Sequence, residues 1–147
     1  MSEIPRAKLG ASTPIFRVQS LEASLDFYLN VLGFKVDWQE RRVFASVTRD
    51  GCTLYLAQHD QGNGGAWAWL GVDDADRLLE ECRASGAKVR HPPTNYTWAY
   101  EMQIEDPDGN VLRVGSAPRK DQPLGEWFDM RGQTWVKDPK GGWTKKP

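Results

Sequence analysis

The chain has 147 residues and two cysteines, which is the size of one domain that buries its core without disulfide bonds. Its net charge of −1 leaves no basic footprint for nucleic acid or for an anionic membrane surface, and no apolar run approaches the roughly 18 residues of a membrane helix. We therefore expect one cytoplasmic domain, residues 1–147, whose partner is a small molecule or another protein.

The first half of the chain reads as a strand, a helix and three strands. Residues 13–18 form the first strand, and Ser20 then precedes a run of leucines at helical spacing that ends at Gly33. Residues 11–58 are the first predicted module. Its three later strands are expected at residues 35–39, 42–48 and 52–58.

The second half repeats this order. A strand at residues 67–72 is followed by a helix that Asp74 opens and Gly86 ends. Residues 66–116 are the second predicted module. Its later strands are expected at residues 88–90, 99–105 and 110–116. The sequence thus predicts an α+β fold, in which two βαβββ repeats form a curved eight-stranded sheet around a groove, with the helices on its convex side.

The segment 117–147 lies outside the repeat. Its tryptophans, Trp127, Trp135 and Trp143, recur every eight residues between turn signals, which is typical of a small β-meander or hairpin with Trp135 and Trp143 as a cross-strand pair. Such a piece is marginal alone, so we expect this C-terminal extension to dock on the main domain or on a partner subunit. A partly disordered tail is the alternative.

Three motifs resemble a known family. They are V-x-[D/S]-L-x-x-S-L-x-F-Y-x-x-V-L-G-F at residues 18–34, G-V-D-D at residues 71–74, and D-P-D-G-N-x-[IL] at residues 106–112. Together they resemble the glyoxalase, bleomycin-resistance and extradiol-dioxygenase superfamily, also called vicinal oxygen chelate proteins, over residues 11–116. The resemblance implies the fold but not the reaction, because this scaffold hosts lyases, dioxygenases and metal-free drug-binding proteins.

The resemblance also implies where a metal would lie. The four positions that hold a divalent metal in enzymes of the family correspond here to Thr13, Tyr55, Trp67 and Arg113. Tryptophan offers no lone pair and arginine is permanently charged, so this set is not a metal site. The chain therefore most resembles the metal-free bleomycin-resistance group, and we expect no metal, no cofactor and no catalytic residue.

Strand alternation predicts the contents of the groove. The loop at residues 107–109 pairs Gln103 with Arg113, which places these residues and Glu101 on the groove face. Trp98 belongs to a Pro-bearing loop, residues 91–99, at one end of the groove. The candidate ligand-binding residues are Thr13, Arg17, Tyr55, Trp67, Trp69, Trp98, Glu101 and Arg113.

Each candidate has a structural alternative. Arg113 either pairs with Glu101 or, like Arg17, grips a ligand carboxylate or phosphate. Trp67 and Trp69 serve as packing, as a dimer contact or as stacking surfaces for a planar ligand.

The sequence favours a metal-free binding protein that resembles bleomycin-resistance proteins. It would sequester a planar or aromatic ligand, act in antibiotic resistance, and share its groove between the subunits of a homodimer. The alternative is a metal-dependent lyase, isomerase or dioxygenase with non-standard site residues such as His59, His91 and Glu101. A protein-interaction module on the same scaffold is a third hypothesis.

Overall fold

The chain folds as two successive modules of the same order, followed by a smaller third sheet. The structure is a computed structural model that describes residues 4–147, so the first three residues of the predicted domain lie outside it. The first module contains β1 (Ile15–Val18), α1 (Leu21–Asp26), the π-helical turn η1 (Phe27–Val31), β2 (Lys35–Glu40), β3 (Phe44–Arg49) and β4 (Cys52–Gln58). The second contains β5 (Trp67–Gly71), α2 (Ala75–Ser85), β6 (Lys88–Asn95), β7 (Tyr100–Glu105) and β8 (Val111–Ser116). The C-terminal extension contains β9 (Trp127–Phe128), β10 (Thr134–Lys137) and β11 (Trp143–Lys145).

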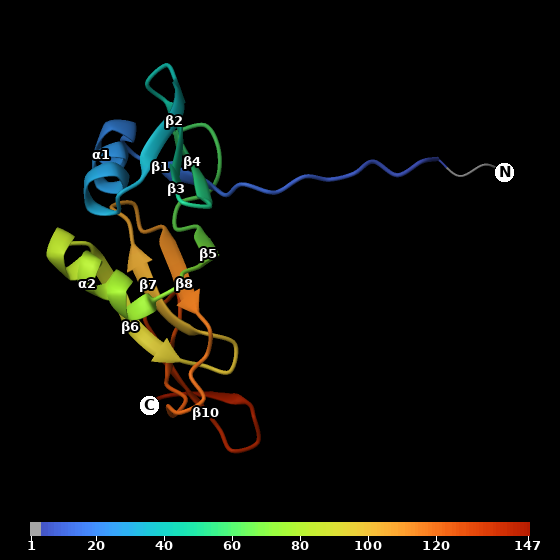
Figure 1. The fold of residues 1–147 in the computed structure, drawn as a ribbon, viewed down its shortest axis with the longest axis vertical. Coiled ribbons are helices and arrows are strands. Elements are labelled where there is room, and N and C mark those ends of the chain that lie inside the picture. Colours follow the sequence, from blue (N-terminus) through green and yellow to red (C-terminus); the bar gives the residue numbers. More distant parts are fainter. Residues whose placement is uncertain (1–3) are drawn as a thin grey trace.

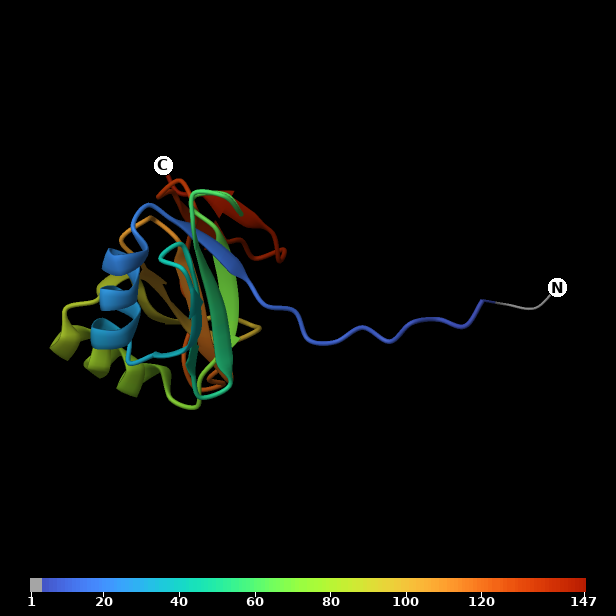
Figure 2. The same ribbon diagram turned by 90° about the horizontal axis from the view of Figure 1, so that it is seen from above.

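The eight module strands are hydrogen-bonded as two mixed sheets of four, in the orders β1-β4-β3-β2 and β5-β8-β7-β6. In each sheet the outer strand, β1 or β5, runs parallel to its neighbour, and the other pairs are antiparallel. Figure 1 shows the modules one above the other with α1 and α2 on the same side, and Figure 2 shows the segment before β1 leaving the body as an extended arm. The predicted α+β class with two βαβββ modules is confirmed.

Local side-chain chemistry sets the helix ends. The Ser20 hydroxyl accepts a hydrogen bond from the Ala23 N–H at 3.2 Å, and Asp74 accepts one from the Arg77 N–H at 3.0 Å. Gly86, with φ of +80°, ends α2 in the left-handed conformation that favours glycine. These residues are the helix signals predicted from the sequence.

The β7–β8 hairpin has the predicted register. Gln103 pairs with Arg113 and Ile104 pairs with Leu112, around a loop in which Gly109 has φ of +80°. Ile104 and Leu112 are buried on the helix-covered face of the second sheet. We call the opposite face of this sheet, which carries Gln103 and Arg113, the groove face.

Three hairpin loops of the second module and the C-terminal extension use the same chemistry. Asp106, Asp129 and Asp138 each accept, at one carboxylate oxygen, the backbone N–H groups two and four residues later, all within 3.0 Å. The glycine three residues after each aspartate has a positive φ, of 80°, 79° and 94° respectively. The loop that marks the second module therefore recurs twice in the C-terminal extension.

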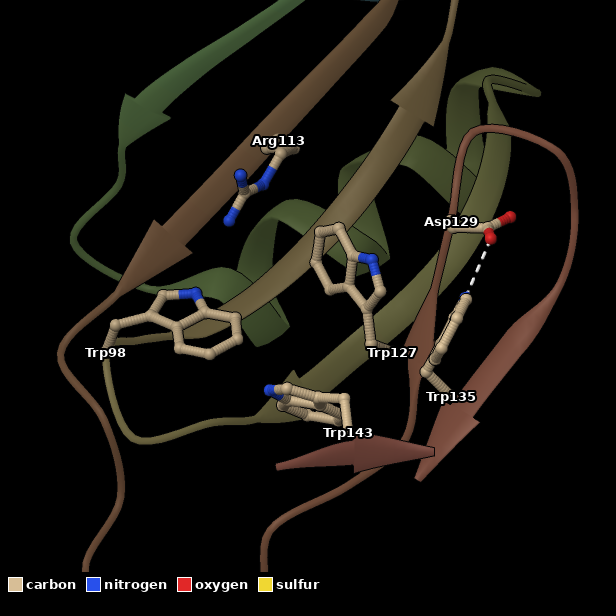
Figure 3. Close-up of a pocket in the computed structure, with 6 residues that line it drawn as sticks. All are labelled: Trp98, Arg113, Trp127, Asp129, Trp135 and Trp143. Atoms are coloured by element: carbon tan, nitrogen blue, oxygen red, sulfur yellow. Dashed lines mark hydrogen bonds between the residues drawn. The ribbon is translucent and has the colours of Figure 1, made fainter. Parts of the chain in front are cut away.

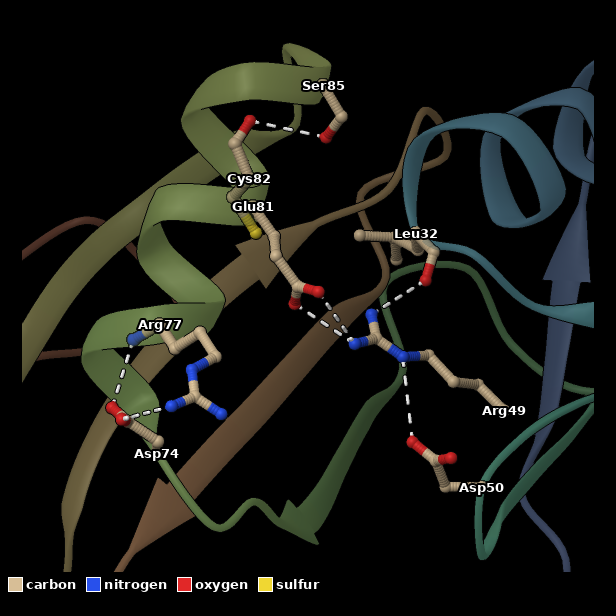
Figure 4. Close-up of polar contacts among 8 residues, drawn as sticks. All are labelled: Leu32, Arg49, Asp50, Asp74, Arg77, Glu81, Cys82 and Ser85. Carbon is tan, nitrogen blue, oxygen red and sulfur yellow. Dashed lines mark hydrogen bonds and ion pairs between the residues drawn. The ribbon is translucent and has the colours of Figure 1, made fainter.

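The two modules share one hydrophobic core and are joined by polar contacts. The Tyr28 hydroxyl of the first module donates to the buried Asp106 carboxylate of the second at 2.9 Å. Arg49 donates to Glu81 of α2 at 3.0 Å and to the Leu32 carbonyl at 2.9 Å (Figure 4). The largest fully buried apolar side chains of the core are Phe16, Val18, Leu21, Tyr28, Val47, Leu54, Leu56, Met102, Ile104 and Val111.

Candidate functional site

The C-terminal extension covers the groove face of the second module. The Gln103 side chain donates to the Phe128 carbonyl at 3.0 Å, and the Arg113 guanidinium carbon lies 4.8 Å from the centre of the Trp127 ring. Arg90 donates to the Asp129 carbonyl as well. Gln103 is consequently only 2% exposed, although strand alternation turns it away from the main core. These contacts place the extension on the main domain, which is one of the two docking surfaces that the sequence left open.

The tryptophans of the extension lie on one face of its sheet. Trp135 pairs with Trp127 across β10 and β9, whereas Trp143 pairs with Lys137 across β11 and β10. Residues two apart in a strand point to the same side, so all three indoles and Lys137 share a face. The predicted cross-strand pair of Trp135 and Trp143 is therefore wrong, because the register of β10 and β11 places Lys145 opposite Trp135 and Lys137 opposite Trp143.

This face and the groove face border an open cavity of about 590 Å³. We call it the aromatic cavity (Figure 3). Its lining residues are Trp98, Arg113, Trp127, Asp129, Trp135 and Trp143. A volume in this range suits a small molecule, and an indole-rich wall suits a planar one.

An ion pair forms the floor of the aromatic cavity. Glu101, which is 1% exposed, accepts hydrogen bonds from Nε and Nη2 of Arg113 at 2.9 Å each, and from the Trp98 indole N–H. Arg113 thus forms a bidentate ion pair with Glu101. This arrangement is the structural alternative that the sequence left open for Arg113, and it leaves one guanidinium nitrogen, Nη1, outside the pair.

Tyr96 connects the loop that carries Trp98 to the C-terminal extension. The rings of Tyr96 and Trp98 stack at 4.8 Å with an interplanar angle of 3°, and the Tyr96 hydroxyl donates to the Glu126 carbonyl at 2.7 Å. Burial, followed by the nearby Glu101 carboxylate, raises the pKa of Tyr96 to about 12. The wall of the cavity thus depends on a protonated tyrosine.

Replacement of Tyr96 by phenylalanine is expected to lower the free energy of unfolding at pH 7 and to raise it at pH 12. At pH 7 the lost hydrogen bond lowers the free energy of unfolding by about 1 kcal/mol. Because the folded pKa is raised, the stability that Tyr96 contributes is complete below pH 10 and is lost, by about 2–3 kcal/mol, as the pH rises through 12. Urea unfolding of both proteins at the two pH values measures this, and a difference that does not change with pH would contradict it.

The structure brings together only part of the predicted set of site residues. Trp98 and Arg113 line the aromatic cavity, and both donate to Glu101, which is buried beneath it. Trp67 lies beside them, with its ring 6.4 Å from the Trp127 ring. Trp69, on the same strand, is 53% exposed and contributes instead to a cleft between the modules.

The first-module candidates lie elsewhere. Tyr55 packs in an aromatic group with Trp38 and Phe44, at ring distances of 5.5 and 5.3 Å. Thr13 lines the cleft between the modules, which has a volume of about 850 Å³, and Arg17 lines a smaller pocket of about 350 Å³. Within the single chain, these side chains and the aromatic cavity are separate features.

Four lining residues of the aromatic cavity were absent from the predicted set. They all belong to the C-terminal extension, namely Trp127, Asp129, Trp135 and Trp143. The signal that could have identified them is the eight-residue tryptophan period together with the repeated Asp-x-x-Gly loop. What the sequence did not indicate is that this face would close over Arg113.

The donor set does not fit a divalent metal. At the positions where the resemblance implies metal ligands, Trp67 offers no lone pair, and Arg113 is paired with the buried Glu101. His91 packs against Phe128 at 5.9 Å, and His59 lines the pocket of Arg17. Within residues 4–147, no three His, Cys, Asp or Glu side chains gather closely enough to hold a metal ion.

Comparisons with known proteins agree with this fold. The model of the glyoxalase/bleomycin resistance protein/dioxygenase superfamily matches residues 11–114. A lactoylglutathione lyase of Neisseria meningitidis serogroup A is 32% identical over 112 residues, which are 65% of this chain and 81% of that protein.

Two solved structures have a similar fold. A glyoxalase/bleomycin resistance protein/dioxygenase from Nocardioides superposes with a TM-score of 0.64 at 20% identity, covering 83% of this chain and 93% of that one. The bleomycin-binding protein of Streptomyces verticillus, complexed with copper(II)-bleomycin, has a TM-score of 0.61 at 24% identity, covering 76% of this chain and 99% of that one. The family match ends before β9, so the tryptophan face of the C-terminal extension lies outside it. Among the described residues, neither helix has the length and apolar character needed to cross a bilayer.

Proposed function

The chain belongs to the glyoxalase/bleomycin resistance protein/dioxygenase superfamily, and from this premise we propose that it is a metal-free binding protein that sequesters a planar or aromatic small molecule. The observation that carries the proposal is the aromatic cavity, in which four indoles surround a space of about 590 Å³. Indole faces stack on planar ligands, and sequestration requires affinity but no reacting group. The bleomycin-binding protein of similar fold supports a role of this class.

A homodimer in the cytoplasm, acting in antibiotic resistance, is part of the same proposal. The aromatic group of the first module, formed by Trp38, Phe44 and Tyr55, leaves Trp38 46% exposed. A second subunit that covers this group would bring Tyr55 to a shared groove. Cys52 and Cys82 are both unpaired, which is consistent with a reducing compartment.

The ligand-binding proposal predicts unequal effects of two replacements in the C-terminal extension. Trp143→Ala, which removes one wall of the aromatic cavity, is expected to weaken the binding of 2-naphthoate, a planar aromatic probe, by tenfold or more, because each stacked aromatic contributes about 1–3 kcal/mol. Met130→Ala removes an exposed apolar side chain of the same extension that does not line the aromatic cavity, and it is the control, with an expected change below about threefold. Isothermal titration calorimetry measures both, with bleomycin titrated in parallel.

Equal losses of affinity in the two variants would show that the ligand does not bind in the aromatic cavity. A wild-type protein that gives no heat with either 2-naphthoate or bleomycin would contradict the binding proposal for these ligands.

A metal-dependent lyase is the second candidate function, and the 32% identity to the Neisseria lactoylglutathione lyase favours it. The side chains at the implied ligand positions argue against it, as described above for Trp67 and Arg113. Elemental analysis of the purified protein separates the two candidates, since stoichiometric nickel, zinc, iron or manganese would support the lyase and contradict the metal-free proposal.

A further inference from the structure

Two carboxylates lie at the aromatic cavity, Asp129 in its lining and Glu101 buried beneath it, and their acceptor capacity is mostly used within the protein. Asp129 accepts from the N–H groups of Arg131 and Gln133 at one oxygen, and from the Trp135 indole N–H at the other, at 2.7 Å. Glu101 accepts three hydrogen bonds from Arg113 and Trp98, and it is buried beneath them. A carboxylate has about four acceptor sites, so few remain for a ligand.

The donors of the same cavity are less fully used. Nη1 of Arg113 and the indole N–H groups of Trp127 and Trp143 have no hydrogen-bond partner within residues 4–147, and none of these nitrogens is a buried unsatisfied atom. The Arg113 guanidinium extends toward the space between Trp98 and Trp127 (Figure 3). A molecule in the cavity would therefore meet hydrogen-bond donors more often than acceptors.

Positive groups of the protein already lie over two of the four indoles of the aromatic cavity, where a cationic ligand would otherwise stack. The Arg113 guanidinium carbon lies 4.8 Å from the Trp127 ring centre, and the Lys137 ammonium lies 5.2 Å from the Trp143 ring centre. A ligand cation would have to displace these groups or approach them closely, and like charges repel. A ligand anion would meet the same groups with favourable sign, while the carboxylates of Asp129 and Glu101 are directed at donors of the protein itself.

From these contacts we infer that the aromatic cavity selects planar aromatic carboxylates over planar aromatic cations, with Arg113 Nη1 and Lys137 as the charge-selecting groups. This inference rests on the proposed function and names the ligand class for that site. Stacking on the indoles supplies affinity for any planar body, and the donors select the substituent. The selecting tryptophans and Lys137 come from the C-terminal extension, so the selectivity is a property of the extension and not of the two modules.

Three probes with one aromatic body test the inference. They are 2-naphthoate, 2-naphthylmethanol and 2-naphthylmethylammonium, titrated calorimetrically at pH 7 and low salt, where charge effects are least screened. The expected order is naphthoate first, with at least tenfold tighter binding than the ammonium, and the alcohol between them. Equal affinities, or tighter binding of the ammonium, would overturn the inference while leaving the proposed planar-ligand site intact. Failure of all three probes to bind would overturn both.

A lysine variant tests the assignment to the C-terminal extension. Lys137→Gln should lower the affinity for 2-naphthoate about three- to tenfold and leave that for 2-naphthylmethanol unchanged. Lys140→Gln removes the same charge from the exposed loop between β10 and β11 and is the matched control, with naphthoate affinity within twofold of the wild type. Equal effects of the two variants would show only a general charge contribution and would overturn the role of Lys137.

Discussion

Replacement of Asp106 by alanine is expected to lower the free energy of unfolding by about 3–5 kcal/mol. Its carboxylate accepts the Tyr28 hydroxyl at 2.9 Å and three N–H groups of Asp108 and Asn110, all within 3.0 Å. Tyr28 and Asn110 are both fully buried, so water cannot replace the lost acceptor. Each buried donor left without a partner costs about 1–3 kcal/mol, and the Tyr28 contact also joins the two modules.

The repeated loop supplies the control for this prediction. Asp138 accepts the same pair of backbone N–H groups in the loop before β11, but that loop is exposed and joins only two strands of the C-terminal extension. Asp138→Ala should therefore cost about 1 kcal/mol or less. Urea unfolding followed by circular dichroism measures both. Similar losses at the two sites would mean that local turn chemistry, and not the contact between modules, determines the effect at Asp106.

The fold could be predicted to a large extent because its signals are local. Ser20, Asp74 and Gly86 act within one helical turn, and the loop around Gly109 fixes the β7–β8 register, since a shift by one residue would turn Ile104 toward the groove face. The same order of strands and helix occurs in both modules, so the pattern in one module supports the prediction for the other. These elements depend on neighbours a few residues away.

The aromatic cavity depends on contacts between residues far apart in the chain. Arg90 and Gln103 are held to the backbone of Phe128 and Asp129, 25 to 39 residues away, and nothing in either segment's pattern specifies the other. The tryptophan period identified the strands of the C-terminal extension but not the surface on which they dock. Strand alternation placed Gln103 correctly on the groove face, yet its burial follows from the docked extension.

Replacement of Arg113 by methionine is expected to lower the free energy of unfolding by about 3 kcal/mol. Methionine retains the length of the side chain, but the Glu101 carboxylate, with 1% of its side chain exposed, then keeps only the Trp98 N–H as a partner. An unpaired buried charge costs about 3–5 kcal/mol, and the 27% exposure of the Arg113 side chain places the expected loss at the lower end of that range. Urea unfolding at pH 7 measures the change.

A double-mutant cycle separates the pair from the packing around it. Glu101→Gln alone should cost about 1 kcal/mol, because glutamine still accepts from Trp98 and water reaches part of the freed guanidinium. Glu101→Gln added to Arg113→Met should recover most of the stability, since no buried charge then remains. A double variant as unstable as the sum of the single variants would show that Arg113 stabilises the protein by packing on Trp127.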